Sequence, residues 1–471
     1  MFKKYKNNNI KLQNYAHSII PGLSGLLGKR PELYLPGGAW PTYYSRAKGI
    51  NIWDLKGKKY IDFTMVGVGS CVLGYADKDI DAVTKKILSQ GPLTTLNPPE
   101  EIILAELLLG IHKWAEQVKF ARTGGEINSV AIRLARSYTK RDKIMICGYH
   151  GWHDWYLSTN LKNKSNLNNH LLAGLNPTGV PKGLKNTVIP FNFNNCNDLE
   201  NVVRKRAKEC AAIIMEPARN TIGCSHFLKS IRKIATQNNC VLIFDEITSA
   251  WRHGTSGIHK EIGVNPDLAT FGKTMANGIS ISALIGKKKI MSEAKNSFIS
   301  STNWTERLGP ATAVAFIQKH KRLNLGKVLK EKGKKIRNIW INAAKDAGIE
   351  YSKTSDLGLA CFAKKNKIKK NNSNLKLEIS GIESLSSFKI ITKNEKDWPI
   401  IITFFIQEML KEGILSSERC YSNYCQTEAL LGRYEKACKK VFKKISFHLA
   451  SNNLKKQLDG PVKQMGFKRL N

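Results

Sequence analysis

The segments VLIFDEITSA (residues 241–250) and PDLATFGKTMANGIS (266–280) decide the fold of this chain of 471 residues. The first begins as an apolar run and breaks at Asp245, which is the pattern of a buried strand that ends on an acid. The second places Lys273 in a loop flanked by glycine, 28 residues after Asp245. The two segments therefore predict a site in which an acid and a lysine act together.

Lys273 and Asp245 are what pyridoxal phosphate chemistry requires. A lysine amine can hold this cofactor as a Schiff base, and a carboxylate can keep the pyridine nitrogen protonated so that the ring acts as an electron sink. We therefore expect pyridoxal 5'-phosphate as the cofactor and these two residues as the catalytic pair.

The segment VKFARTGGEINSVAIRLAR (118–136) supplies a place for the cofactor phosphate. Thr123, Gly124 and Gly125 form a turn without bulky side chains, and apolar residues then recur at helical spacing from about Glu126. The free amides and the positive end of the helix dipole at such a turn form an anion site.

An aromatic turn follows the next apolar stretch, in KIMICGYHGWHDWY (143–156). Tyr149 stands at the strand end, where its ring can stack on a flat cofactor, and His150 beside it is a second candidate for cofactor binding. For His153 and Trp155, which lie further from the strand end, we favour a packing role.

Six segments in a fixed order then carry a resemblance, which spans residues 118–310 and extends to 46–75 and 404–415. The chain resembles the class III pyridoxal-phosphate aminotransferases of fold type I, and specifically the glutamate-1-semialdehyde aminomutase branch. The six segments are TGGE, GYHGWHDWY, IIMEPARN, LIFDEITSAWR, PDLATFGK and STNWTERLGP.

The resemblance assigns roles around the cofactor ring. Lys273 matches the Schiff-base lysine, Asp245 the carboxylate on the pyridine nitrogen and Ile247 the aliphatic residue under the ring. Tyr149 matches the aromatic residue on the opposite face. Glu216 matches a glutamate near the phenolic oxygen, although a solvated acid at a strand end is the alternative for it.

The resemblance also implies a homodimer with shared active sites. The turn 123–125 corresponds to the family's Ser-Gly-Thr phosphate turn, and a threonine from the partner subunit also reaches that phosphate. The matching loop here is SSTNWTERLGP (300–310). Counting back from Pro310 favours Thr305, and the shape of the loop also admits Thr302.

Departures from the aminomutase pattern bear on the substrate. The aminomutases clamp a substrate carboxylate with an arginine in the segment that reads LPGGAWPTYYSRAKG (35–49) here, where Arg46 instead begins the first strand. The family's Ser-Trp pair is replaced by Gly67-Val68, and its Ala-His-Thr by residues 425–427, Cys-Gln-Thr. A charged substrate group would lose its fixed partner.

We therefore expect an aminotransferase that moves an amino group from a donor to a carbonyl substrate by a ping-pong mechanism, with sugar-linked compounds among the candidates. Glutamate-1-semialdehyde 2,1-aminomutase is the alternative reaction. A non-catalytic basic binding protein on the same scaffold is the alternative of another class, and the intact Lys273 and Asp245 favour the enzyme.

The predicted architecture is α/β, with a mostly parallel sheet in the large domain and a smaller α+β domain formed by both ends of the chain. Residues 1–100 form an arm and ribbon of the small domain, 101–325 the large cofactor domain and 326–471 the C-terminal part, with helices around two or three short strands. We predict strands of the large sheet at 144–147, 211–215, 241–244 and 283–286.

Composition adds few constraints. The formal charge is +38, and the lysines are spread along the chain with short clusters only at 364–370 and 439–444, so we favour a compositional bias over nucleic-acid binding. An anionic substrate such as a nucleotide-linked sugar also fits that charge.

The ten cysteines form no CxxC pair and predict reduced thiols without a metal site. No run approaches the ~20 apolar residues of a membrane span, and no secretion signal is apparent, so we expect a cytoplasmic protein.

Overall fold

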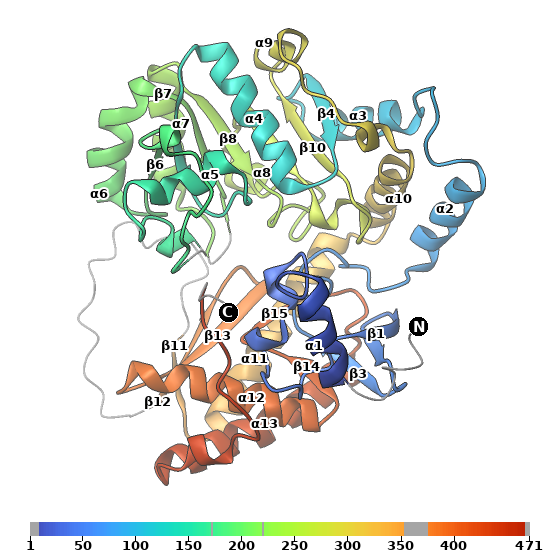
Figure 1. The fold of residues 1–471 in the computed structure, drawn as a ribbon, viewed down its shortest axis with the longest axis vertical. Coiled ribbons are helices and arrows are strands. Elements are labelled where there is room, and N and C mark those ends of the chain that lie inside the picture. The colour runs from blue at the N-terminus through green and yellow to red at the C-terminus, as the bar shows by residue number, and fades with distance from the viewer. Residues whose placement is uncertain (1–8, 171–172, 219–220, 353–374, 467–471) are drawn as a thin grey trace. The chain divides into compact units, whose positions relative to one another are not determined.

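The computed structural model describes residues 9–170, 173–218, 221–352 and 375–466 (Figure 1). The chain forms two compact units. One contains residues 78–328, and the other contains described residues on both sides of it, 9–77, 329–352 and 375–466. The predicted N-terminal segment, 1–100, is thus divided between the units after Asp77.

The unit of residues 78–328 is built on a seven-stranded sheet of order β4-β10-β9-β8-β7-β5-β6. Strands β5 to β9 pair in parallel, and β10 runs antiparallel to both β4 and β9. The predicted mostly parallel sheet is confirmed, and the four predicted strands correspond to β5, β7, β8 and β10. The strands are β4 (Gln117–Ala121), β5 (Lys143–Cys147), β6 (Val188–Pro190), β7 (Cys210–Met215), β8 (Val241–Asp245), β9 (Leu268–Phe271) and β10 (Ser282–Gly286).

Both faces of β8 are covered. Leu242 and Phe244 are fully buried in a hydrophobic cluster with Phe227 and Ile231 of α7. Asp245 is instead hydrogen-bonded to a residue of α4. Successive side chains of a strand point to opposite faces, so α7 and α4 cover different sides of the sheet. The helices of this unit are α2 (Lys78–Ser89), α3 (Glu100–Ile111), α4 (Gly124–Thr139), α5 (Asp154–Leu157), α6 (Cys196–Asp198), α7 (Ser225–Gln237), α8 (His259–Ile262), α9 (Lys288–Met291) and α10 (Leu308–Arg322).

The other unit has two four-stranded sheets, with orders β1-β2-β3-β14 and β11-β12-β13-β15. Five strands follow residue 326 in the described part of the chain, so the prediction of two or three was wrong. Strands β11, β14 and β15 span only three residues each, too few for an apolar period to mark them. The strands are β1 (Tyr44–Lys48), β2 (Asn51–Asp54), β3 (Lys59–Phe63), β11 (Glu350–Ser352), β12 (Leu375–Ser380), β13 (Leu385–Thr392), β14 (Ile414–Ser416) and β15 (Arg419–Tyr421). The helices are α1 (Asn9–Ile19), α11 (Leu325–Asp346, which begins in the other unit), α12 (Trp398–Lys411) and α13 (Glu428–Ala450).

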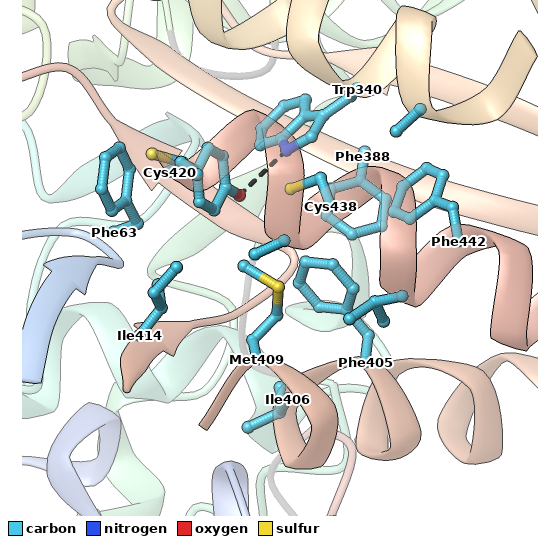
Figure 2. Close-up of a cluster of buried hydrophobic side chains, with 14 of the residues drawn as sticks. Phe63, Trp340, Phe388, Phe405, Ile406, Met409, Ile414, Cys420, Cys438 and Phe442 are labelled. Carbon is cyan, nitrogen blue, oxygen red and sulfur yellow. Dashed lines mark hydrogen bonds between the residues drawn. The ribbon is translucent and has the colours of Figure 1, made fainter. Parts of the chain in front are cut away.

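Aromatic side chains fill the core of this second unit (Figure 2). Phe63 of β3 stacks on Tyr434 of α13 with ring centroids 4.2 Å apart. The Tyr434 hydroxyl accepts a hydrogen bond from Nε1 of Trp340 at 3.0 Å, so the polar atoms of these two buried side chains are paired with each other. The core therefore joins β3, near the N-terminus, to α11 and α13.

The cysteines follow the expectation with one exception. Cys224 is disulfide-bonded, so the prediction of reduced thiols throughout was wrong for this residue. Cys361, the lysine cluster 364–370 and the side chain of Cys196 lie outside the described residues. Seven cysteines are free thiols, namely Cys71, Cys147, Cys210, Cys240, Cys420, Cys425 and Cys438.

Neither a membrane span nor a metal cluster is found in the described part of the chain. None of its helices is long and apolar enough to cross a membrane. Its histidine, cysteine, aspartate and glutamate side chains form no group of three or more that could hold a metal ion.

Candidate active site

The predicted site residues follow the carboxyl ends of strands that point the same way. The turn 123–125 follows β4, Tyr149 follows β5, Asp245 ends β8, and Lys273 follows β9. Because β10 is antiparallel to both β4 and β9, β4 runs in the same direction as the parallel strands. Their carboxyl ends meet at one edge of the sheet, which is where open α/β sheets bind ligands.

Asp245 is almost completely buried and is held by three donors. Its Oδ2 accepts from Nδ1 of His150 and from Nδ2 of Asn128, each at 2.8 Å, and its Oδ1 accepts from the amide of Ile247 at 3.1 Å. Burial alone would raise the pKa of this carboxyl, but the interactions with His150, Asn128 and Ile247 together hold the pKa below its ordinary value. A carboxylate offers about four acceptor positions, so one remains for a further N–H donor.

Asn128 contacts Asp245, and the sequence analysis missed it. It lies on the buried face of α4 between apolar neighbours, and its Oδ1 accepts from the Thr270 hydroxyl at 2.9 Å. The side chain thus connects Asp245 with β9. The available signal was a polar residue on the apolar face of a predicted helix, which is costly unless the residue is hydrogen-bonded.

Lys273 is presented by an unusual backbone conformation. Its φ is +45°, in the left-handed region that few non-glycine residues adopt, and it opens a short 3-10 helix, η9 (Lys273–Ala276). Its Nζ donates to the hydroxyl of Thr248 at 2.8 Å. Thr248 lies three residues after Asp245, so the amine and the carboxylate belong to one local constellation, although sequence analysis did not single out Thr248.

Thr123 and Glu126 form a capping box at the start of α4. The Thr123 hydroxyl accepts from the amide of Glu126 at 3.4 Å, and Oε2 of Glu126 accepts from the amide of Thr123 at 2.7 Å. The helix begins at Gly124, two residues before the predicted start. The Thr-x-x-Glu spacing was the sequence signal for this capping. The amides of Gly124 and Gly125 fall in the first turn, where no helix carbonyl can reach them.

Gly124 lies close to Ile247. A Cβ atom added at Gly124 would come within 2.8 Å of Cδ1 of Ile247, and one added at Gly272 would lie 3.6 Å from its Cγ2. Ile247 is buried and forms a floor between the phosphate turn and the residue that precedes Lys273. This position fits the predicted aliphatic residue under a ring.

Tyr149 and Glu216 are tied together through the backbone. Oε2 of Glu216 accepts from the amide of Tyr149 at 2.9 Å, and Glu216 is only 5 % exposed, so the alternative of a solvated acid was wrong. Gly148, with φ +122°, leaves room for this carboxylate, because a Cβ there would meet Oε2 at 2.7 Å. Tyr156 donates to the Gly148 carbonyl and meets the Tyr149 ring edge-on. The Tyr149 ring is thereby positioned at the strand end.

Trp155 and His153 both pack against residues of α4. Trp155 is 8 % exposed and donates to the hydroxyl of Ser129 on α4. The His153 ring lies against Gly125 of the phosphate turn.

The loop with Thr302 and Thr305 forms a short 3-10 helix, η11 (Thr302–Thr305), and both threonines are exposed. The Thr305 hydroxyl donates to the Thr302 carbonyl at 3.3 Å. In the described part of the chain it forms no hydrogen bond to any other predicted site residue. Trp304 between them donates to Oε1 of Glu126 at 3.3 Å. Arg307 then forms a two-pronged ion pair with Glu100, which fixes the end of the loop.

These residues fit pyridoxal phosphate. Lys273 supplies an amine, and Asp245 is an ionised buried carboxylate with an acceptor position left. Glycines at 124 and 125 let Ile247 and the His153 ring approach the first turn of α4, which a Cβ at either position would prevent. The site therefore offers free amides for a phosphate, a carboxylate for a protonated ring nitrogen and an amine for a carbonyl carbon.

Arg46 belongs to the other unit, as do Val68 and Gln426 from the region that was expected to face the substrate. Arg46 lies in β1 as predicted, is exposed, and places its guanidinium 4.1 Å from the centre of the Trp53 ring. Val68 has φ +56°, which strains a β-branched residue. Gln426 has no exposed surface, and its Oε1 accepts from the amide of Asn423, so the expectation that it faces a substrate was wrong.

Comparisons with known proteins show the family of this chain. The profile of the class-III aminotransferases matches residues 36–370. A 3-aminobutyryl-CoA aminotransferase from Cloacimonas acidaminovorans is 32 % identical over 69 % of this chain and 76 % of its own length. A 2'-deamino-2'-hydroxyneamine transaminase from Streptomyces kanamyceticus is 31 % identical over 64 % of this chain and 72 % of its own.

An aminomutase and a solved structure are also similar to this chain. A glutamate-1-semialdehyde 2,1-aminomutase from Nitrosopumilus maritimus is 35 % identical over 60 % of this chain, and the match spans 65 % of that relative. The FumI protein of Sphingopyxis sp. MTA144, solved with PLP, superimposes with a TM-score of 0.79 at 21 % identity, covering 94 % of this chain and 97 % of that one. The superposition confirms the predicted fold type I architecture.

Proposed function

The chain belongs to the class-III aminotransferases and uses pyridoxal 5'-phosphate, and on this premise we propose that it transfers an amino group between two separate molecules that bind in turn. One observation carries the proposal: the amine of Lys273 and the ionised carboxylate of Asp245 are set at the carboxyl ends of neighbouring parallel strands. The test is steady-state kinetics with donor and acceptor varied together. Parallel double-reciprocal lines support the proposal, and intersecting lines contradict it.

Each residue has a defined part. When bound, pyridoxal phosphate supplies an electron sink for the pair of electrons left on the substrate carbon. Asp245 would accept a hydrogen bond from the ring nitrogen of the bound cofactor, because its neighbours hold the pKa of its carboxyl below the ordinary value. Lys273 would hold the cofactor through its amine, and the same Nζ would accept or donate a proton beside it. The Thr248 hydroxyl accepts a hydrogen bond from that Nζ.

The remaining residues would hold the cofactor in place. Ile247 would lie under one face of the ring and Tyr149 over the other, and the backbone of Tyr149 is fixed by Glu216. His150 and Asn128 orient the carboxylate of Asp245. The Thr123 hydroxyl and the free amides of the first turn of α4 would bind the phosphate, because the helix dipole attracts an anion there. The capping box at the start of α4 supports this assignment.

A sugar-linked carbonyl compound is the acceptor that we favour. The Streptomyces kanamyceticus relative is a transaminase named for an aminoglycoside, a sugar compound. The segment that carries the aminomutases' carboxylate clamp has only Arg46 here, and this side chain stacks on Trp53. The charge of +38 favours an acceptor that carries a phosphate, such as a nucleotide-linked sugar.

Glutamate-1-semialdehyde 2,1-aminomutase is the second candidate. It is favoured by aminomutase relatives at 32–36 % identity. The two reactions differ in whether a separate amino donor is consumed. A mutase returns the amino group to the same carbon skeleton and consumes no second amino donor. Product analysis therefore separates them.

We also propose a homodimer in which η11 of one subunit reaches the phosphate site of its partner. Thr302 and Thr305 are exposed. Arg307 and Trp304 bind the loop to Glu100 and Glu126 of its own subunit. Large apolar side chains of the same unit are also exposed, as expected of a surface that a second subunit covers. They include Leu96, Ile102, Ile103 and Phe298.

A further inference from the structure

His153 occupies the space over the phosphate turn where a side chain at position 125 would begin. A Cβ atom added at Gly125 would lie 2.8 Å from both Nδ1 and Cε1 of the His153 ring. Trp152 stacks on that ring with centroids 4.7 Å apart and planes 25° from parallel. Gly151 allows the approach, because it has φ +109° and lies so near that its own Cβ would be 2.9 Å from Cα of Gly125. The ring is thus held against the first turn of α4.

The buried Nδ1 of His153 has no hydrogen-bond partner in the described part of the chain. Leaving such a nitrogen unpaired is costly, so a buried orphan beside a ligand site points to a partner on the ligand. Burial lowers the pKa of the imidazole, against the opposing effect of the carboxylates of Glu126 and Asp154. A neutral imidazole can still carry its hydrogen on Nδ1 and donate it.

The neighbouring turn has no hydroxyl at its third residue. The resemblance aligns Thr123-Gly124-Gly125 with a Ser-Gly-Thr turn, so the third residue supplies no hydroxyl in this chain. The His153 nitrogen lies 2.8 Å from the point where a side chain at that position would begin. We propose that His153 is a cofactor-binding residue whose Nδ1–H donates to the phosphate at the first turn of α4, in place of the missing threonine hydroxyl. The inference rests on the proposed function, which puts the phosphate at that turn.

Binding to the cofactor-free protein tests the proposal without measuring activity. Dissociation constants are measured for pyridoxal phosphate and for pyridoxal, which lacks the phosphate, with the wild-type protein and His153→Ala. We expect the constant for pyridoxal phosphate to rise about tenfold, roughly 1.4 kcal/mol, and that for pyridoxal to change by less than about twofold. His226→Ala, an exposed substitution on α7, is the matched control.

Two further variants keep the test decisive if His153→Ala folds poorly. His153→Asn retains an N–H donor near the Nδ1 position and is expected to bind pyridoxal phosphate within about threefold of wild type. Gly125→Thr alone should weaken binding, since its Cβ would meet the His153 ring. The double variant Gly125→Thr with His153→Ala should recover affinity, because it restores the hydroxyl and removes the obstruction.

Several outcomes would overturn the inference. An unchanged affinity of His153→Ala for pyridoxal phosphate would do so, as would an equal loss for both ligands or a double variant weaker than both single ones. If the wild-type protein bound pyridoxal phosphate no more tightly than pyridoxal, the phosphate site of the proposed function would be wrong instead. The two failures are therefore distinguishable.

Discussion

His150 donates through Nδ1 to Oδ2 of Asp245 across 2.8 Å, and both side chains are almost completely buried. The next residue repeats the relationship, because Oε1 of Glu246 lies 2.9 Å from Nδ1 of His259 and both of these side chains are fully buried. Consecutive strand residues point to opposite faces, so the end of β8 is braced by one histidine on each side. The Asp245 carboxylate is consequently fixed in direction before any ligand binds.

Asp245→Asn should slow amino transfer severely while leaving the protein folded. An amide cannot stabilise a protonated ring nitrogen, and the loss should be on the scale of other preorganised electrostatic contacts, ~3–4 kcal/mol of transition-state stabilisation. The half-reaction with an amino donor, followed by stopped-flow absorbance, measures the loss. A rate within about tenfold of wild type would show that Asp245 does not hold the ring nitrogen.

His150→Ala should shift the acid side of the pH profile. Asp245 is active as the ionised form, and its pKa is held down by the interactions with His150. Removing this partner leaves burial less opposed, so the pKa rises and kcat/KM falls off at a higher pH as the solution is acidified. His150→Asn, which keeps an N–H donor, should stay closer to wild type. Superimposable acid limbs for all three proteins would contradict the assigned role of His150.

Lys273→Ala should abolish turnover and the attachment of cofactor that borohydride makes permanent. The substitution removes the amine assigned to cofactor attachment and proton transfer, whereas thermal unfolding should change little because the side chain is only half-buried. Mass spectrometry of the reduced protein reads the attachment directly. Lys208→Ala, an exposed lysine, is the matched control. Full turnover by Lys273→Ala would refute the assignment.

The roles of Lys273 and Asp245 could be predicted from sequence because their signals are local. Lys273 and Asp245 sit at the ends of short apolar runs, and a strand end followed by a distinctive polar residue can be read within about ten positions. The supporting contacts are not local. Asn128 and Asp245 are 117 positions apart, and their pairing depends on the stacking of α4 on the sheet. The prediction for Gln426 was wrong for the same reason, because only the fold shows that its Oε1 accepts a hydrogen bond from the amide of Asn423.

The shared site predicts complementation between inactive chains. Lys273→Ala chains supply intact η11 loops, and Thr305→Ala chains supply intact lysines, so a mixed dimer should contain one complete site. Mixing the two under exchange conditions should restore up to about a quarter of wild-type activity, since half of randomly paired dimers are mixed and each has one good site of two.

Two measurements control the complementation. Thr302→Ala in place of Thr305→Ala decides which threonine crosses, because only the variant of the crossing residue is impaired alone. Sedimentation at working concentration provides the independent check on assembly. A fully active monomer would exclude the shared site.

The reaction itself gives the last prediction. We expect the aminated form of the enzyme to pass its amino group to a separate carbonyl compound, with sugar-linked acceptors faster than glutamate-1-semialdehyde. The reason lies in the substrate clamp: Arg46 is exposed and stacked on Trp53, and no other arginine occurs between residues 35 and 49 to hold a small carboxylate. Stopped-flow mixing of that form with candidate acceptors, combined with quantification of the donor consumed, measures both rate and balance. Rapid formation of 5-aminolevulinate from glutamate-1-semialdehyde without consumption of a second donor would establish the aminomutase reaction instead, and would require that a group other than an arginine of that segment binds the carboxylate.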